Sequence, residues 1–323
     1  MFGFIGSRLL QAIPVLLVVG FIAFALFAYV GDPVSILLGQ DYTAAQRADL
    51  IKQLGLDQPF FVQYGRFLWT ALHGDFGISY RLAQPVSTLI AERLPATLEL
   101  AITASVLAFA VGVPLGVYTG IHRNTTLSRL FMTASLIGVS LPTFLLGILL
   151  ILVFSVGLGW LPSFGRGPVT HLGPWWTTGF TSWGGIRSLI LPAITLGMFQ
   201  MTLIMRLVRS EMLEVLRTDY IKFARARGLT SRSINFGHAL KNTLVPVITI
   251  IGLQFGGIVA FSLVTETVFQ WPGMGLLLVQ SVAAADIPVM SAYLLLIALV
   301  FVLINLTVDL LYYAVDPRLR ARR

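Results

Sequence analysis

The chain has 323 residues, of which 56% are hydrophobic and 11% are charged, and its mean hydropathy is +0.85. A soluble domain carries about 25% charged residues, so this composition excludes an ordinary soluble protein and predicts an all-α membrane protein with several spans. The absence of cysteine excludes disulfide bonds, thiolate metal sites and cysteine nucleophiles. The net charge of +8 does not indicate a nucleic-acid partner, because the basic residues cluster at the ends of apolar runs.

The first apolar run, Leu9–Val30, is free of charged residues over 22 positions. It is long enough to cross the roughly 30 Å hydrocarbon core of a bilayer and predicts the first span. The alternative is a cleaved signal peptide, but the run exceeds the apolar core of about 7–15 residues that such peptides carry.

Residues 31–95 are polar to mixed and predict a lid of amphipathic helices on the outer membrane face. Each predicted helix begins at a capping residue or proline and ends at a glycine or proline, and the three cover residues 43–55, 59–74 and 85–95. His73 and Asp75 would in isolation suggest a metal or acid–base pair. Two residues do not make a site, and the glycines beside them favour a turn.

Two further spans are expected at Leu100–Ile121 and Leu130–Gly157, the latter kinked at Pro142. Small residues repeat every four positions on one face of the second span, at Gly112, Gly116 and Gly120. Such spacing lets two helices approach closely, and it favours helix packing over a translocation-path face.

Residues 158–187 are rich in glycine, proline and tryptophan and predict an outer loop with an interfacial tryptophan belt. The last three spans are expected at Ser188–Met205, Asn242–Thr265 and Ile287–Val308. The charge-free run 267–285 is broken early by Pro272 and two glycines, so it is too short to cross and predicts a re-entrant or surface helix.

Arg206–Pro246, between the fourth and fifth spans, holds eight of the 22 Lys and Arg residues. Its pattern predicts a basic helix–turn–helix with Gly228 at the bend, because glycine adopts the left-handed conformation at low cost. Apolar residues recur at helical spacing and predict one face, formed by Val208, Met212, Val215, Leu216, Tyr220 and Phe223. On charge alone, a solvated positive-inside loop is the alternative.

Six spans with a cytoplasmic N-terminus place 15 basic residues inside and seven outside. This asymmetry obeys the positive-inside rule and predicts that both termini are cytoplasmic.

The chain lacks a phosphate-binding loop of the G-x-x-x-x-G-K-[ST] kind, and its four histidines fall in no catalytic motif. It is therefore expected to be neither an ATPase nor another enzyme. Charged and polar groups in spans are often functional, so Glu266, Gln254 and Asp309 are candidates for the substrate path or a gate. Their alternatives are a salt bridge or interfacial carboxylate for Glu266, helix packing for Gln254 and a cytoplasmic ion pair for Asp309.

Strings along nearly the whole chain resemble one transporter family: RLLQAIPVLLVV, GDPVSILLG, LGLDQPFFVQY, HGDFGISY, YIKFARARGL and VDLLYYAVDPRLR. They resemble ATP-binding-cassette (ABC) importer permeases of the dipeptide and oligopeptide subfamily. The chain departs from the wider family's Glu-Ala-Ala signature, because Lys222 stands where the glutamate would be. The residues that match the subfamily's ATPase-coupling loop are Tyr220, Ala224, Ala226, Arg227, Gly228, His238 and Pro246.

The resemblance implies an all-α permease of the bacterial inner membrane, a single domain over residues 1–323. Its parts would be the outer helical segment 31–95, a core at 96–315 and a coupling loop at 206–241. The implied partners are a second permease, two ATPase subunits that bind ATP and magnesium, an external binding protein and membrane lipid, with no cofactor or metal in this chain. Family relatives carry nickel, glutathione or other small solutes, so these substrates stay open beside peptides. A self-contained secondary transporter or channel is the alternative of a different class.

Overall fold

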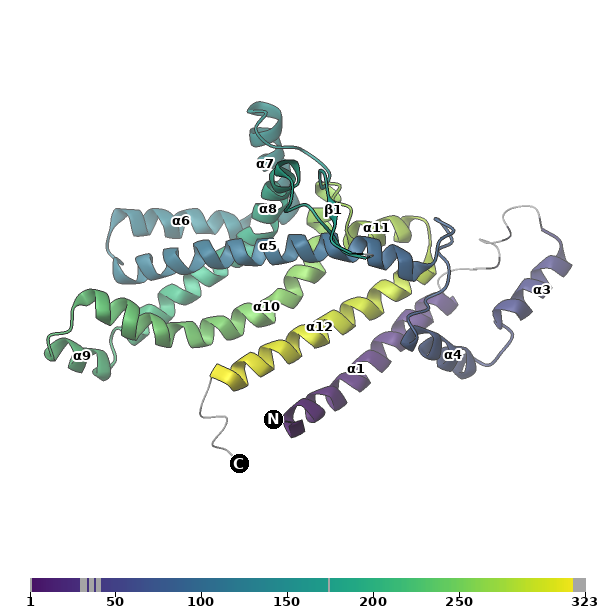
Figure 1. Cartoon of the computed structure of the whole chain (residues 1–323), viewed down its shortest axis with the longest axis horizontal. Coiled ribbons are helices and arrows are strands. Elements are labelled where there is room, and N and C mark those ends of the chain that lie inside the picture. The colour runs from purple at the N-terminus through teal and green to yellow at the C-terminus, as the bar shows by residue number, and fades with distance from the viewer. Residues whose placement is uncertain (1, 30–33, 35–37, 39–41, 174, 316–323) are drawn as a thin grey trace. The chain divides into compact units, whose positions relative to one another are not determined.

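The structure is a computed structural model that describes residues 2–29, 34, 38, 42–173 and 175–315 (Figure 1). It is built of helices, with two short strands, β1 and β2, that pair in a two-stranded sheet. The helices up to the strands are α1 (Phe2–Tyr29), α3 (Ala44–Leu54), α4 (Phe60–Leu72), α5 (Val86–Ile121), α6 (Thr126–Ser140), α7 (Thr143–Leu150) and the π-helical η1 (Ile151–Gly157). The strands are Thr170–His171 and Thr177–Thr178. The remaining helices are α8 (Trp183–Val215), α9 (Asp219–Ala226), the π-helical η2 (Ser233–Ala239), α10 (Leu240–Val268), α11 (Met274–Ala283) and α12 (Ile287–Val315).

Within the described residues, four helices are long and apolar enough to cross a membrane: α1, α5, α8 and α12. A fifth span arises if α6 and the α7–η1 pair are counted together, although they are bent by 111°. Helix α10 adds a shorter apolar stretch, Gln254–Val268. The prediction of an all-α multi-spanning protein is confirmed, and the count of six spans stays a prediction.

The expected third span, Leu130–Gly157, is two helices rather than one kinked helix. Leu141 has φ −86° and ψ 132°, and Pro142 has φ −57° and ψ 139°, so two consecutive residues are extended. A proline disfavours the helical conformation of the residue before it, and this turns the expected kink into a break.

The prediction of a separate short helix over 85–95 is wrong, because α5 runs without interruption from Val86 to Ile121 through Pro95. Proline removes one helical hydrogen bond, but the turns beyond it carry buried residues such as Ala96 and Leu100. Packing of this face therefore outweighs the local preference for a break.

By its internal contacts the chain divides into two compact units. Unit 1 comprises Met1–Ala96, His171–Thr177 and Pro272–Leu303. Unit 2 comprises Thr97–Thr170, Thr178–Trp271 and Ile304–Arg323.

In unit 1, the two helices predicted over 43–55 and 59–74 are confirmed, and their place on the outer membrane face stays a prediction. Thr43 caps α3 through a capping box with Gln46, and Gly55 ends it at φ 67°. Helix α4 packs on α1, where the Tyr64 hydroxyl donates a 2.7 Å hydrogen bond to the Leu17 carbonyl and the rings of Phe24 and Phe60 are 5.1 Å apart. Aromatic packing therefore holds α4 against α1.

The turn predicted at His73 and Asp75 is also confirmed in unit 1. The Asp75 carboxylate accepts a 2.9 Å hydrogen bond from the Gly77 backbone, and His73 Nδ1 lies 2.8 Å from the Trp69 carbonyl oxygen. Both side chains serve the local backbone, and Gly77 has the positive φ, 81°, that such a turn requires.

Asp286, ahead of α12, ties down the next turn of unit 1. Its buried carboxylate accepts hydrogen bonds from the Ser79 hydroxyl and from the backbone of Tyr80 and Arg81. Burial and the neighbouring Asp286 carboxylate raise the pKa of Tyr80 to about 12, so this phenol stays neutral at physiological pH. Helix α11, with buried Met274, packs in the same unit and spans only 10 residues, too few to cross.

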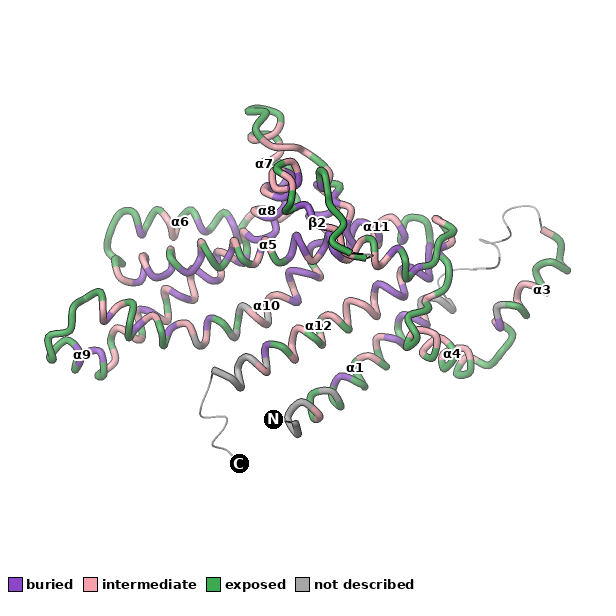
Figure 2. The backbone as a smooth tube through the Cα atoms, viewed as in Figure 1, coloured by how far each residue is buried: buried purple, intermediate pink, exposed green. Residues whose placement is uncertain are grey.

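In unit 2, the glycines of α5 lie against α8, which is buried along much of its length (Figure 2). A Cβ atom added at Gly112 would lie 2.9 Å from the Met201 carbonyl oxygen, and one at Gly116 would lie 2.7 Å from that of Met205. Such distances are shorter than real Cβ contacts, so the glycines permit the close approach of the two helices. The predicted packing role is confirmed.

We expect Gly116→Ala to destabilise the protein by about 1–3 kcal/mol, because overpacking forces α5 and α8 apart. Gly65→Ala is the matched control, since Gly65 also lies in a helix and has no atom within 4 Å of the added Cβ. Thermal unfolding of the detergent-solubilised transporter compares the two. Equal unfolding temperatures for Gly116→Ala and the unchanged chain would contradict the packing role.

Candidate functional site

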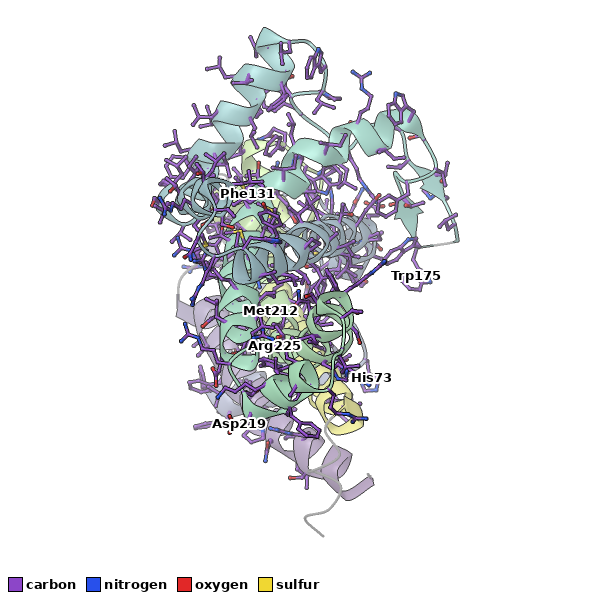
Figure 3. The ribbon with its side chains drawn as sticks, turned by 90° about the vertical axis from the view of Figure 1, so that its left-hand side faces the viewer. His73, Phe131, Trp175, Met212, Asp219 and Arg225 are labelled. Carbon is purple, nitrogen blue, oxygen red and sulfur yellow. The ribbon has the colours of Figure 1, made fainter. Side chains whose placement is uncertain are left out.

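The basic segment between α8 and α10 forms a compact hook in unit 2. Helix α8 ends at Val215, a three-residue turn follows, and α9 begins at Asp219. Ile221 and Ala224 of α9 are buried in the same cluster as Val208 and Met212 of α8. Figure 3 labels Asp219 and Arg225 of α9 and Met212 of α8. Side chains of α9 and α8 therefore pack in one buried cluster.

The prediction of a single apolar helix face from Val208 to Phe223 is wrong for Tyr220 and Phe223. The break after α8 rotates α9, so that Ile221 and Ala224 point inward while Tyr220 and Phe223 are 42% and 65% exposed. The spacing from Val208 to Phe223 suits a continuous helix, and the sequence did not signal the break.

Gly228 ends α9 in a Schellman motif. The Leu229 backbone N–H donates to the Ala224 carbonyl at 3.3 Å, and the Gly228 N–H donates to the Arg225 carbonyl at 2.9 Å. Gly228 has φ 78°, with open space where a Cβ would lie. The predicted bend is confirmed, and glycine is favoured there by the backbone conformation alone.

Other residues of the predicted coupling loop lie around this bend. The Tyr220 hydroxyl accepts a 2.6 Å hydrogen bond from Asn242 Nδ2, which ties α9 to the start of α10. Ala226 and Arg227 are exposed beside Gly228, His238 is exposed on η2, and Pro246 is half-buried within α10.

We call the exposed apolar side chains of this hook the docking surface: Tyr220, Phe223, Leu229 and Phe236. Exposed basic residues accompany them, including Arg225 and Arg227, and the Arg227 guanidinium lies 5.8 Å from the centre of the Phe223 ring. Exposed aromatic and arginine side chains are enriched where proteins bind one another, so this surface suits a protein partner with acidic groups.

Glu266 is buried near the end of α10. Its Oε1 accepts hydrogen bonds from the Thr97 hydroxyl at 2.7 Å and the Ser262 hydroxyl at 3.0 Å. The side chain is fully inaccessible to solvent. In this conformation Glu266 holds α5 and α10 together, and its role in a gate stays a prediction.

Sequence reasoning missed a buried ion pair in unit 2, between Arg166 and Glu99. The Arg166 guanidinium donates two hydrogen bonds to Glu99 Oε2, and the Gly179 backbone N–H donates to Glu99 Oε1 at 2.9 Å. Glu99 and Arg166 are 4% and 7% exposed. The pair fastens the loop that follows η1 to α5. The only sequence signals were one arginine in a loop otherwise poor in charge and one carboxylate at a span.

Gln254 lines a cavity of about 320 Å³ between α7, α8 and α10. Thr143 and Gln200 line the same cavity, and Gln200 was not a candidate from sequence. Glu266 is not among the lining residues, so the structure does not bring these two candidates of α10 together. The side chain of Asp309, the third candidate, lies outside the described part of the structure.

Comparison with known proteins places these features in a family. The family described as binding-protein-dependent transport system inner membrane component matches residues 112–321, and its N-terminal component matches residues 1–101. This chain belongs to that family. The permease is thus an inner-membrane protein with several spans and a non-enzymatic component of an ABC importer.

Relatives cover almost the whole permease. A Brucella abortus protein assigned to a peptide transport system as its permease is 43% identical, over 97% of this chain and 98% of the relative. The glutathione transport system permease of Salmonella typhimurium is 42% identical over 99% of both chains. The dipeptide transport system permease of Alkalihalophilus pseudofirmus is 39% identical over 97% of this chain and 98% of its own.

A solved structure shares the fold. The inward-facing MetNI methionine ABC transporter superposes with a TM-score of 0.56 at 22% identity, over 71% of this chain and 96% of the matched chain. Family membership and this fold disfavour a self-contained secondary transporter or channel.

Proposed function

We propose that this chain is the translocating permease subunit of an ATP-driven importer of small peptides. In this proposal a second permease completes the pathway, two ATPase subunits bind ATP and magnesium, and an external binding protein delivers the substrate. Both termini lie in the cytoplasm. The names of the peptide, dipeptide and glutathione permeases that it resembles support the substrate class.

The observation that carries the proposal is the hook of α9. One side of α9 exposes Tyr220 and Phe223 of the docking surface, and the other side buries Ile221 and Ala224 among residues of α5, α8 and α10. A partner bound at the docking surface can therefore move the spanning helices, as coupling to ATP hydrolysis requires. The predicted coupling residues Tyr220 and Gly228 serve this geometry by tying α9 to α10 and by ending α9.

The test is purification of the tagged chain from its native membrane in mild detergent, with partners identified by mass spectrometry. We expect two ATPase subunits and a second permease to co-purify. The purified complex, reconstituted with its binding protein in liposomes, should take up radiolabelled Ala-Ala only when ATP is present. A chain that purifies alone and transports without ATP would overturn the proposal.

A further inference from the structure

The cavity between α7, α8 and α10 combines a mostly apolar lining with a few polar side chains. It is open on one side and holds about 320 Å³, a volume within the range of small-molecule sites. Most of its wall is apolar, and its polar side chains are two glutamines and one threonine: Gln200, Gln254 and Thr143. No charged side chain lines it among the described residues.

Gln200 is the informative member of this lining. It is 4% exposed, and its side-chain Nε2 has no hydrogen-bond partner among the described residues. A buried amide without a partner costs the free energy of an unmade hydrogen bond, and a leucine of similar size would avoid that cost. Packing therefore gives no reason for a glutamine here, whereas a ligand that accepts its N–H would.

Both glutamines lie at the middle of their helices. Gln200 is 17 residues from the start of α8 and 15 from its end, and Gln254 is 14 residues from either end of α10. Gln254 lies at the middle of the expected span Asn242–Thr265, and Gln200 lies five residues, about 7–8 Å, inside the end of the expected span Ser188–Met205, so both glutamines lie within the expected hydrocarbon core.

We propose that this cavity binds the transported solute through its peptide bond. The Gln200 side chain turns its buried Nε2 toward the cavity and donates a hydrogen bond to the carbonyl oxygen of the solute, and the Gln254 amide provides the second contact, to the peptide N–H. The side-chain amide of glutamine matches a peptide group in both donor and acceptor. This inference rests on the proposed function and adds how the solute is recognised.

The neutral lining also sets the substrate class. Burying an ionised group without a charged partner is costly, so the uncharged peptide group lies against this lining and the charged ends of the solute, such as the ammonium and carboxylate of Ala-Ala, lie toward the open side of the cavity. Divalent nickel favours imidazole, thiolate or carboxylate ligands, and this lining offers amide and hydroxyl groups instead. The same site would accept peptides that differ in side chain, and also glutathione, which contains peptide bonds.

The test uses the transporter reconstituted with its partner subunits and binding protein, and radiolabelled Ala-Ala as the probe. We expect Gln200→Leu to lower ATP-dependent uptake about tenfold at limiting Ala-Ala, equivalent to about 1.4 kcal/mol. The thermal unfolding temperature should be unchanged or higher, because a buried unpaired amide has been removed. Gln254→Leu should also lower uptake. Gln53→Leu, at an exposed position on α3, is the control that should leave uptake unchanged.

The outcomes separate this inference from the proposed function. If the unchanged transporter imports Ala-Ala and Gln200→Leu imports it equally well, the cavity does not bind the solute and the importer proposal stands. If Gln200→Leu lowers the unfolding temperature together with uptake, Gln200 is structural and the inference fails. If the unchanged complex does not import Ala-Ala, the peptide proposal itself fails.

Discussion

Replacing Arg166 by leucine is expected to destabilise this permease by about 3–5 kcal/mol, because the substitution leaves the Glu99 carboxylate buried without its cation. Glu99 is 4% exposed and, within the described part of the chain, would keep two hydrogen bonds, from the Gly179 backbone N–H at 2.9 Å and the Thr178 hydroxyl at 3.5 Å. Denaturant titration of the detergent-solubilised protein measures the loss.

A second substitution tests the physical cause. Glu99→Gln added to Arg166→Leu removes the uncompensated charge but keeps an oxygen for the Gly179 N–H, so the double variant should be more stable than Arg166→Leu alone. Arg123→Leu, at an exposed position, is the matched control and should change stability by less than about 0.5 kcal/mol. An Arg166→Leu protein as stable as the unchanged chain would show that the pair contributes nothing.

The sequence predicted features that depend on local chemistry. The capping box at Thr43, the bend at Gly228 and the glycines of α5 all follow from the preferences of a few neighbouring residues. Pro142 marks the right position, but the structure has a break there instead of a kink, because the proline also favours the extended conformation of Leu141.

Features that depend on distant contacts could not be predicted in the same way. Glu99 and Arg166 are 67 positions apart, and nothing near either residue specifies the other. Gln254 was a candidate because of its place in a span, whereas Gln200 became one only when α8 and α10 were seen to enclose a common cavity. The direction in which Tyr220 and Phe223 point was set by a three-residue turn that the apolar spacing does not reveal.

Gly228→Val is expected to abolish most transport while ATP hydrolysis continues. Gly228 has φ 78°, and for an L-residue the left-handed conformation costs roughly 1–2 kcal/mol, with a β-branched residue such as valine at a further disadvantage. Gly228→Val should therefore break the Schellman motif and reorient the end of α9. Ile221, in the first turn of α9, stays anchored in the buried cluster, so the spans and the assembly should persist. We expect uptake of Ala-Ala by the reconstituted complex to fall about tenfold or more while ATP hydrolysis continues.

Gly228→Asn is the control that assigns this effect to the backbone. Asparagine enters the left-handed region far more readily than valine, and open space surrounds the position, so the Asn variant should keep most of the uptake. If valine and asparagine impaired uptake equally, a side chain at the docking surface would be the cause, and the bend would not be. Normal uptake by Gly228→Val would remove the coupling role from this turn and leave the hook as a passive, positively charged loop.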